Sequence, residues 1–150
     1  MDTIQCAIVL AKLERFAWEL ERRQQVGRRY HELLAGRFPF HGPERTEALG
    51  CQVLPWPDAC RNSVFAQFTV LVRNRDAVQE RLKNAGVPTA VHYPIPLNEQ
   101  PAYAKFCCPE CTPTASMLGK QVMSLPFSAD LSDADQDHVC KALAEAVSNC

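Results

Sequence analysis

The side chains best suited to chemistry lie in one proline-rich loop, residues 89–103, which reads TAVHYPIPLNEQPAY. His92 can hydrogen-bond a substrate or move a proton near neutral pH, and Tyr93 and Asn98 add a hydroxyl and an amide. Asn98 does not titrate, which argues against an acid–base role at that position. Three prolines stiffen the loop, so it is suited to holding these side chains in place. The alternative interpretation is that packing against the prolines merely fixes His92.

A second group of reactive side chains is the run CCPEC at residues 107–111, which contains one C-x-x-C spacing. A structural zinc site needs about four ligands and usually a second pair of this kind, and Cys51 and Cys60 are too far apart in sequence to form one. No thioredoxin-like βαβ pattern surrounds the run, which argues against a redox dithiol. We favour a surface loop with incidental thiols, while a zinc site assembled by folding and a redox pair stay open.

The composition excludes several classes of function. The chain has 150 residues and a formal net charge of -1, and its basic residues form no stripe, so we expect no nucleic-acid partner. No apolar run reaches the roughly 18 residues that span a bilayer, and no basic cluster opens the chain, so we expect neither a membrane segment nor a signal peptide. The eight cysteines are therefore expected to be reduced thiols of a cytoplasmic protein.

The elements that must position the loop read as alternating helices and strands. Apolar spacing predicts helices over residues 1–36, with an end at Gly36, and then over 74–85, 113–122 and from 132 onward. Asn74 is a candidate helix cap, and Ser132 with Asp135 has the spacing of a capping box. The first helical region carries four arginines that we expect to form a solvated face: Arg22, Arg23, Arg28 and Arg29.

Residues 63–72 give the strongest strand prediction, because they are rich in β-branched and aromatic residues and contain no breaker. Residues 87–91 and 123–127 read as two more strands, and a short strand near 51–54 is plausible. This order predicts a single α+β domain over residues 1–150, with a small antiparallel or mixed sheet of about three strands packed by helices.

Six ordered segments of this chain resemble the sugar-nucleotide aminotransferases of the DegT/DnrJ/EryC1/StrS family. HYPIPLNEQPAY from residue 92 is similar to the family's HYPxPLHxQPAY, with Asn98 in place of a second histidine. The others are MDTIQCA from residue 1, the helix around 12–30, SVFAQF at 63–68, AGVPT at 85–89, and MSLPF at 123–127 continuing to LSDADQ at 131–136. The resemblance implies the C-terminal domain of a fold-type I pyridoxal-phosphate aminotransferase.

In that family the loop borders the sugar-nucleotide pocket, so the resemblance implies that His92, Tyr93 and Asn98 bind substrate. The complete enzyme would transfer an amino group, commonly from glutamate, to a keto-sugar nucleotide for polysaccharide or antibiotic sugar synthesis. The family's Schiff-base lysine lies in a large N-terminal domain. None of the five lysines here has a similar context: Lys12, Lys83, Lys105, Lys120 and Lys141.

We therefore expect a truncated or detached C-terminal domain that is inactive alone. No catalytic, cofactor-binding or metal-binding residue is assigned in this chain, and pyridoxal phosphate belongs to the complete enzyme. The expected partner is a second copy of the chain or a separate N-terminal aminotransferase domain. Two alternatives stay open: a self-associating interaction module built on the N-terminal helices, and a metal-binding domain that uses Cys107, Cys108 and Cys111.

Overall fold

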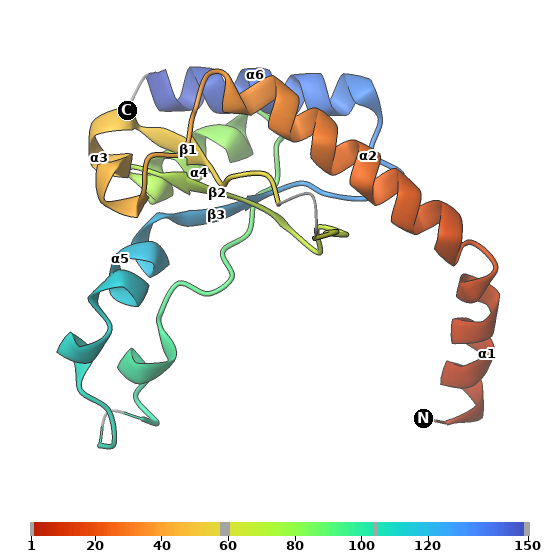
Figure 1. The fold of residues 1–150 in the computed structure, drawn as a ribbon, viewed down its shortest axis with the longest axis horizontal. Helices are drawn as coiled ribbons and strands as arrows, with labels where there is room; N and C mark the ends of the chain where they lie inside the picture. The colour runs from red at the N-terminus through yellow and green to blue at the C-terminus, as the bar shows by residue number, and fades with distance from the viewer. Residues whose placement is uncertain (1, 58–60, 104, 149–150) are drawn as a thin grey trace.

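A computed structural model describes residues 2–57, 61–103 and 105–148, and it shows an α+β fold around a small antiparallel sheet (Figure 1). The strands are β1 (Cys51–Val53), β2 (Phe68–Val72) and β3 (Val122–Leu125), in the order β1-β2-β3. In the central strand, Val70 pairs with Val53 on one side and with Met123 on the other. The predicted fold class and small sheet are confirmed.

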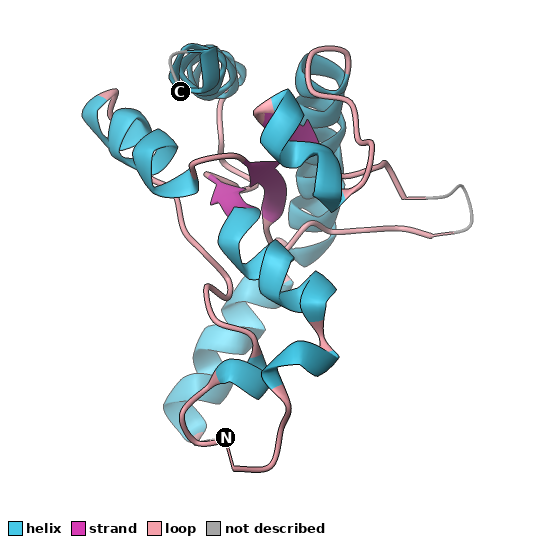
Figure 2. Ribbon diagram, turned by 90° about the vertical axis from the view of Figure 1, so that its left-hand side faces the viewer, coloured by secondary structure: helices cyan, strands magenta, loops and turns pink. Residues whose placement is uncertain are grey.

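Three helices pack together against the sheet: α2 (Phe16–Ala35), α4 (Arg75–Asn84) and α6 (Asp133–Ser148). Figures 1 and 2 show α2 and α6 lying along one side of the sheet, while two arms extend to the other. One arm is α1 (Thr3–Leu13). The other holds the loop after residue 91, with η2 (Leu97–Glu99), η3 (Pro109–Cys111) and α5 (Pro113–Gln121). Before β1 come η1 (Pro43–Arg45) and α3 (Thr46–Leu49).

The core lies between the helices and the sheet and consists of aliphatic and aromatic side chains. Tyr30 of α2 is fully buried, its ring lies 5.0 Å from that of Phe68, and its hydroxyl donates to the Pro126 carbonyl at 2.9 Å. The ring thus packs against other apolar groups while the hydroxyl has a hydrogen-bond acceptor, as buried tyrosines usually require. The other residues of α2 and β2 in this hydrophobic core are Val26, Leu34, Val70 and Val72.

Three of the predicted strands were wrong in extent or kind. Residues 63–72 were expected to be one strand, but β2 begins only at Phe68, because Phe65 has a positive φ of 46° that no strand residue adopts. Residues 87–91 are not a strand, since only Ala90 bridges to Ser124. The third strand of the sheet is instead the short segment at 51–53, which pairs with β2 at the opposite edge, and the last strand begins and ends earlier than the 123–127 predicted.

The helix predictions were closer, although two proposed caps differ in detail. Residues 1–36 form two helices joined at Glu14 and Arg15, and the second ends before Gly36 as expected. Asn74 precedes α4, but its side chain makes no capping hydrogen bond. At α6 the Asp135 backbone amide donates to the Ser132 hydroxyl, as in a capping box. The Asp135 carboxylate, however, accepts from the Ser132 hydroxyl and not from the Ser132 backbone amide.

The six cysteines within the described residues are all free thiols. Met1, Cys60 and Cys150, which entered the sequence interpretation, lie outside the described residues. Among the described helices, none is both long enough and apolar enough to cross a bilayer.

Candidate functional site

The loop and α5 enclose a groove of about 840 Å³ within the second arm. All three residues predicted to bind substrate line this groove: His92, Tyr93 and Asn98. The opposite wall is the face of α5 that carries Ala115, Leu118 and Gly119. The structure therefore brings the predicted residues together around one open, largely apolar space.

Side-chain hydrogen bonds fix the shape of the loop and join it to α5, and a glycine on α5 allows a close approach. The Gln100 amide group donates to the Ile95 carbonyl at 3.2 Å, which closes the turn around η2. The hydroxyl of Ser116, on α5, donates to the carboxylate of Glu99. A Cβ placed on Gly119 would lie only 3.1 Å from the Pro94 carbonyl oxygen, so the loop approaches the helix where a side chain is missing.

Tyr93 is strongly exposed, with 79% of its surface accessible. Its ring lies edge-on to that of His92, with centroids 6.3 Å apart, and the peptide bond between the two residues is cis. Asn98 is half-buried and donates a long hydrogen bond of 3.5 Å to the Cys108 carbonyl. Tyr93 and His92 are thus both exposed, whereas Asn98 is half-buried and already hydrogen-bonded.

His92 also borders a smaller hollow of about 280 Å³ at the end of β3. That hollow is lined by backbone and side chains of residues around Ala66, Pro88 and Phe127. One histidine therefore lies between a large groove on the loop side and a small one on the sheet side. A ligand that bridged both would meet its imidazole.

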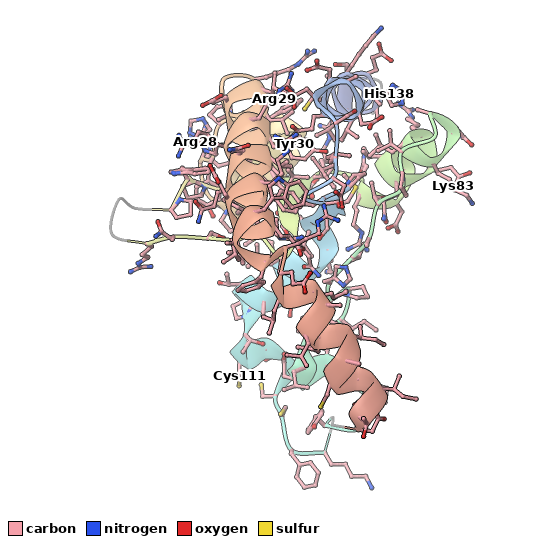
Figure 3. The ribbon with its side chains drawn as sticks, turned by 90° about the vertical axis from the view of Figure 1, so that its right-hand side faces the viewer. Arg28, Arg29, Tyr30, Lys83, Cys111 and His138 are labelled. Atoms are coloured by element: carbon pink, nitrogen blue, oxygen red, sulfur yellow. The ribbon has the colours of Figure 1, made fainter. Side chains whose placement is uncertain are left out.

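The groove does not fit pyridoxal phosphate within this chain alone. The cofactor requires a lysine for its covalent link and an acidic partner for its ring nitrogen. Among the described residues that line the groove, none is lysine, arginine, aspartate or glutamate. The five lysines lie elsewhere, and Figure 3 shows Lys83 at the far end of the molecule from the arm that carries Cys111.

The cysteine run lies in the same arm but shows no metal centre. Within the part of the chain that the structure describes, no three histidine, cysteine, aspartate or glutamate side chains are grouped so as to hold a metal ion. Cys108 and Cys111 are exposed, and Cys107 is half-buried. The sequence alternative of a metal-binding domain therefore gains no support from these residues.

Sequence reasoning missed both the α5 wall and the role of Arg23. The wall could have been inferred from the apolar spacing of α5, but that spacing does not say which segment faces it. Arg23 was expected on a solvated face, yet its side chain is only 18% exposed. It donates to the carbonyls of Val64, Phe65 and Ala66 at 3.0, 2.8 and 3.3 Å, and so holds the turn before β2.

Comparison with known proteins connects this arrangement to one family. The profile of the DegT/DnrJ/EryC1/StrS aminotransferase family matches residues 1–144. A curated relative, the UDP-2-acetamido-2-deoxy-3-oxo-D-glucuronate aminotransferase of Pseudomonas aeruginosa, is 42% identical over 95% of this chain and 36% of its own length. The chain therefore spans about a third of the length of the curated relatives that it matches.

Solved structures agree with the sequence comparison. A DegT DnrJ EryC1 StrS aminotransferase from Brucella abortus is similar with a TM-score of 0.81 and 32% identity, over 97% of this chain and 35% of the other. DesV from S. venezuelae, solved in complex with a ketimine intermediate, gives a TM-score of 0.82 at 29% identity, over 98% of this chain and 37% of the other. From its sequence and its fold together, this chain belongs to the DegT/DnrJ/EryC1/StrS aminotransferase family.

Proposed function

We propose that this chain forms, as a single domain, the C-terminal part of a pyridoxal-phosphate-dependent aminotransferase that acts on a keto-sugar nucleotide in the cytoplasm. Its groove would form the substrate side of the active site, and the cofactor and its lysine would come from a large N-terminal domain. The product would be an amino sugar nucleotide for polysaccharide or antibiotic sugar synthesis, with glutamate as the expected amino donor. The chain alone would not transfer amino groups.

The groove is the observation that supports this proposal most directly. It is large enough for a sugar nucleotide, because ligand pockets commonly measure about 300–1,000 Å³, and it measures about 840 Å³ here. Its walls are apolar except for a few polar groups, the usual composition of a small-molecule site. The P. aeruginosa relative is named for an oxidised UDP-sugar acid, which fits a polar ligand with a sugar ring.

Each of the three predicted residues would make a different interaction with the substrate. The exposed Tyr93 ring offers a flat face to a sugar and a hydroxyl to its polar edge. The His92 imidazole can donate or accept a hydrogen bond, and Asn98 can bind a hydroxyl through its amide. None of these groups can replace the cofactor lysine, so we assign them to substrate binding and not to the transfer step.

Cofactor binding by the isolated chain gives the first test. Purified protein is mixed with pyridoxal phosphate, reduced with borohydride and digested, and the peptides are searched for a lysine that carries the cofactor. We expect no site-specific modification above that of a denatured control. A single lysine modified stoichiometrically in the folded chain, together with a matching absorbance band, would overturn the proposed inactivity.

A chimera tests the substrate-binding role. Residues 1–144 replace the matching third of the P. aeruginosa relative, and amino transfer from glutamate to its keto-sugar nucleotide is followed by product analysis. We expect activity in the chimera, a KM raised about tenfold or more by Tyr93→Ala, and a smaller rise for Asn98→Ala. Phe106→Ala serves as the matched control, since that ring is 83% exposed in the same arm but does not line the groove.

The chimera also shows how the proposal could fail. Circular dichroism and cofactor absorbance establish first that the chimera and each variant are folded and loaded. If the loaded chimera transfers amino groups equally well with Tyr93→Ala, His92→Ala and Phe106→Ala, the groove is not the substrate site.

A second candidate function is self-association, which the exposed face of α1 favours. None of the α1 residues is buried, and Ile4, Ile8 and Leu10 are 75%, 53% and 66% exposed. Exposed apolar surface of this kind commonly marks an interface. A large domain or a second copy of the chain could cover it, and light scattering of the isolated chain distinguishes a homo-oligomer from a monomer.

A further inference from the structure

The three cysteines between the groove loop and α5 are not used by the proposed function. Cys107 is half-buried, while Cys108 and Cys111 are exposed at the two ends of a single turn. Figure 3 shows Cys111 in the arm below the sheet, away from α2 and α6. Exposure gives small molecules in solution direct access to both thiols.

The backbone places Cys108 and Cys111 at disulfide spacing. The Cys111 amide donates to the Cys108 carbonyl at 3.2 Å, which closes the 3₁₀ turn of η3 between them. The Cα atoms that such a turn joins are less than about 7 Å apart, and a disulfide needs roughly 4.4–6.8 Å. The Cα atoms of Cys108 and Cys111 are therefore within the separation that a disulfide can span.

The two thiols differ in acidity. The neighbouring Cys111 side chain, as the main cause, and the Glu110 backbone amide lower the pKa of Cys108. The Cys108 side chain raises the pKa of Cys111. Cys108 is accordingly the more readily ionised member of the pair, and the thiolate is the form that attacks a disulfide.

Cys107 cannot take the place of Cys111 as the partner of Cys108. Adjacent Cα atoms across a trans peptide are about 3.8 Å apart, which is shorter than the roughly 4.4 Å that a disulfide requires. The Cys107 amide is instead bonded to the Tyr103 carbonyl at 3.1 Å. Cys107 therefore serves as a control: it is a neighbouring thiol whose Cα separation from Cys108 is unfavourable for a disulfide.

We propose that Cys108 and Cys111 are a redox modification site that closes to a reversible disulfide by exchange with a small-molecule disulfide such as oxidised glutathione. The Cys108 thiolate attacks one glutathione sulfur and releases the first glutathione as a thiolate. The Cys111 sulfur, after losing its proton, attacks the mixed disulfide at Cys108 and releases the second. Two protein thiols are oxidised, one glutathione disulfide is reduced, and the two protons pass to the released glutathione thiolates.

The position of the pair gives the oxidation a structural consequence. The Cys108 carbonyl accepts the hydrogen bond from Asn98 on the groove loop, and α5 begins two residues after Cys111. A disulfide across η3 would fix the turn that connects the two walls of the groove. Because both sulfurs are exposed, reduced glutathione can reach and reopen the bond, as in labile disulfides generally.

Peptide mapping tests the proposal on the whole chain. The protein is equilibrated in buffers of decreasing reduced-to-oxidised glutathione ratio, quenched with acid, alkylated and digested with trypsin. Cleavage after Lys105 and Lys120 gives one peptide, residues 106–120, that contains Cys107, Cys108 and Cys111 and no other cysteine. We expect the triply alkylated peptide to be replaced by a singly alkylated one, and dithiothreitol to restore it.

Three variants assign the bond. We expect Cys107→Ser to keep the oxidisable pair, and Cys108→Ser and Cys111→Ser to lose it, while the circular dichroism of all three is unchanged. The proposal is overturned if the wild-type peptide stays triply alkylated at every ratio, if it ends as a stable glutathione adduct, or if Cys107→Ser abolishes the disulfide. The result is independent of aminotransferase activity, so its failure would leave the proposed function untouched.

Discussion

Gly27 shows how one missing side chain shapes the packing of α2. A Cβ at this position would lie 2.5 Å from Cδ2 of Phe65 and 2.7 Å from Cε2, so the ring would have to move. Gly27→Ala gains up to about 1 kcal/mol of helix propensity, but forcing a methyl into a packed site costs about 1–3 kcal/mol. We expect a net loss of about 1 kcal/mol in the free energy of unfolding, measured by urea denaturation.

Gly36→Ala is the matched control for this substitution. Gly36 also has a helical φ, but no atom lies within 4 Å of a Cβ placed there. Its replacement is expected to leave stability unchanged or to raise it by about 0.4–1 kcal/mol through the unfolded chain. Equal effects of the two substitutions would contradict the close approach of Phe65.

Cys51 gives the protein a pH dependence that a surface thiol would not. Burial raises its pKa from 9.0 to about 12, because the thiolate loses its hydration in the core. Between these values the unfolded chain releases the proton and the folded chain keeps it, so the free energy of unfolding is unaffected below pH 9 and falls as the pH rises toward 12. We expect Cys51→Val to make that fall shallower in denaturant titrations across this range.

Other groups titrate in the same range, and the comparison with the variant separates them. Burial also raises the pKa of Cys140, to about 11, and that of Tyr30 above its usual value of 10.0. These contributions are common to the wild type and to Cys51→Val, so they cancel in the difference. A difference that does not grow above pH 9 would mean that the Cys51 thiol is not protected from ionisation.

The pairing of the strands shows which elements the sequence could predict. β2 was predicted because its β-branched and aromatic residues carry the signal locally, and β3 was predicted with its bounds shifted by one or two residues. The turn before β2 was not, since the φ of 46° at Phe65 depends on a distant helix: Arg23 of α2 binds three consecutive carbonyls there. Residues 87–91 have strand composition but make only one bridge, so composition alone overestimated the sheet.

Arg23 therefore connects two elements, and its removal tests the connection. Arg23→Ala leaves three carbonyls without their donor and removes the guanidinium that lies 5.0 Å over the Phe127 ring. Hydrogen bonds to a charged group contribute about 1.5–3 kcal/mol each. The net loss is smaller than their sum, because the exposed carbonyls form hydrogen bonds with water in the variant. We expect a loss of about 2–3 kcal/mol in the free energy of unfolding, and only partial recovery in Arg23→Lys, whose single ammonium cannot span the turn.

Arg15→Ala controls for the loss of a charge. Its guanidinium is 68% exposed and lies 3.5 Å from Asp130, an ion pair of the kind that contributes about 0–1 kcal/mol. If Arg15→Ala and Arg23→Ala destabilise the protein equally, the carbonyl contacts of Arg23 do not hold the turn in place.

The whole molecule has two arms on the same side of the sheet, and the sequence anticipated only part of their arrangement (Figure 1). The loop residues were identified because His92, Tyr93 and Asn98 lie in one short loop and are distinctive in type. Their opposing wall on α5 is formed by small and aliphatic residues that carry no chemical signal. Which segment of the chain faces the loop depends on contacts between residues far apart in sequence. The α5 wall was therefore harder to predict than the loop.

The apolar face of α1 leads to a prediction at this scale. Ile4 and Ile8, one helical turn apart, share a face that no described part of the chain buries. We expect the isolated chain to self-associate through this face at high concentration. Burying an isoleucine contributes about 1.5–3 kcal/mol. The double variant Ile4→Ser/Ile8→Ser should therefore raise the dissociation constant of self-association about tenfold or more, as measured by light scattering over a concentration series.

The second arm supplies the control, because Phe106 is more exposed than either isoleucine yet lies in the loop arm. Phe106→Ser should leave the measured mass unchanged, and neither variant should alter the unfolding transition, since no α1 residue contributes to the core. A clean monomer of wild type at the highest concentration would exclude self-association through α1. If the large domain of the P. aeruginosa relative then binds the wild type but not the double variant, the face of α1 is where that domain docks.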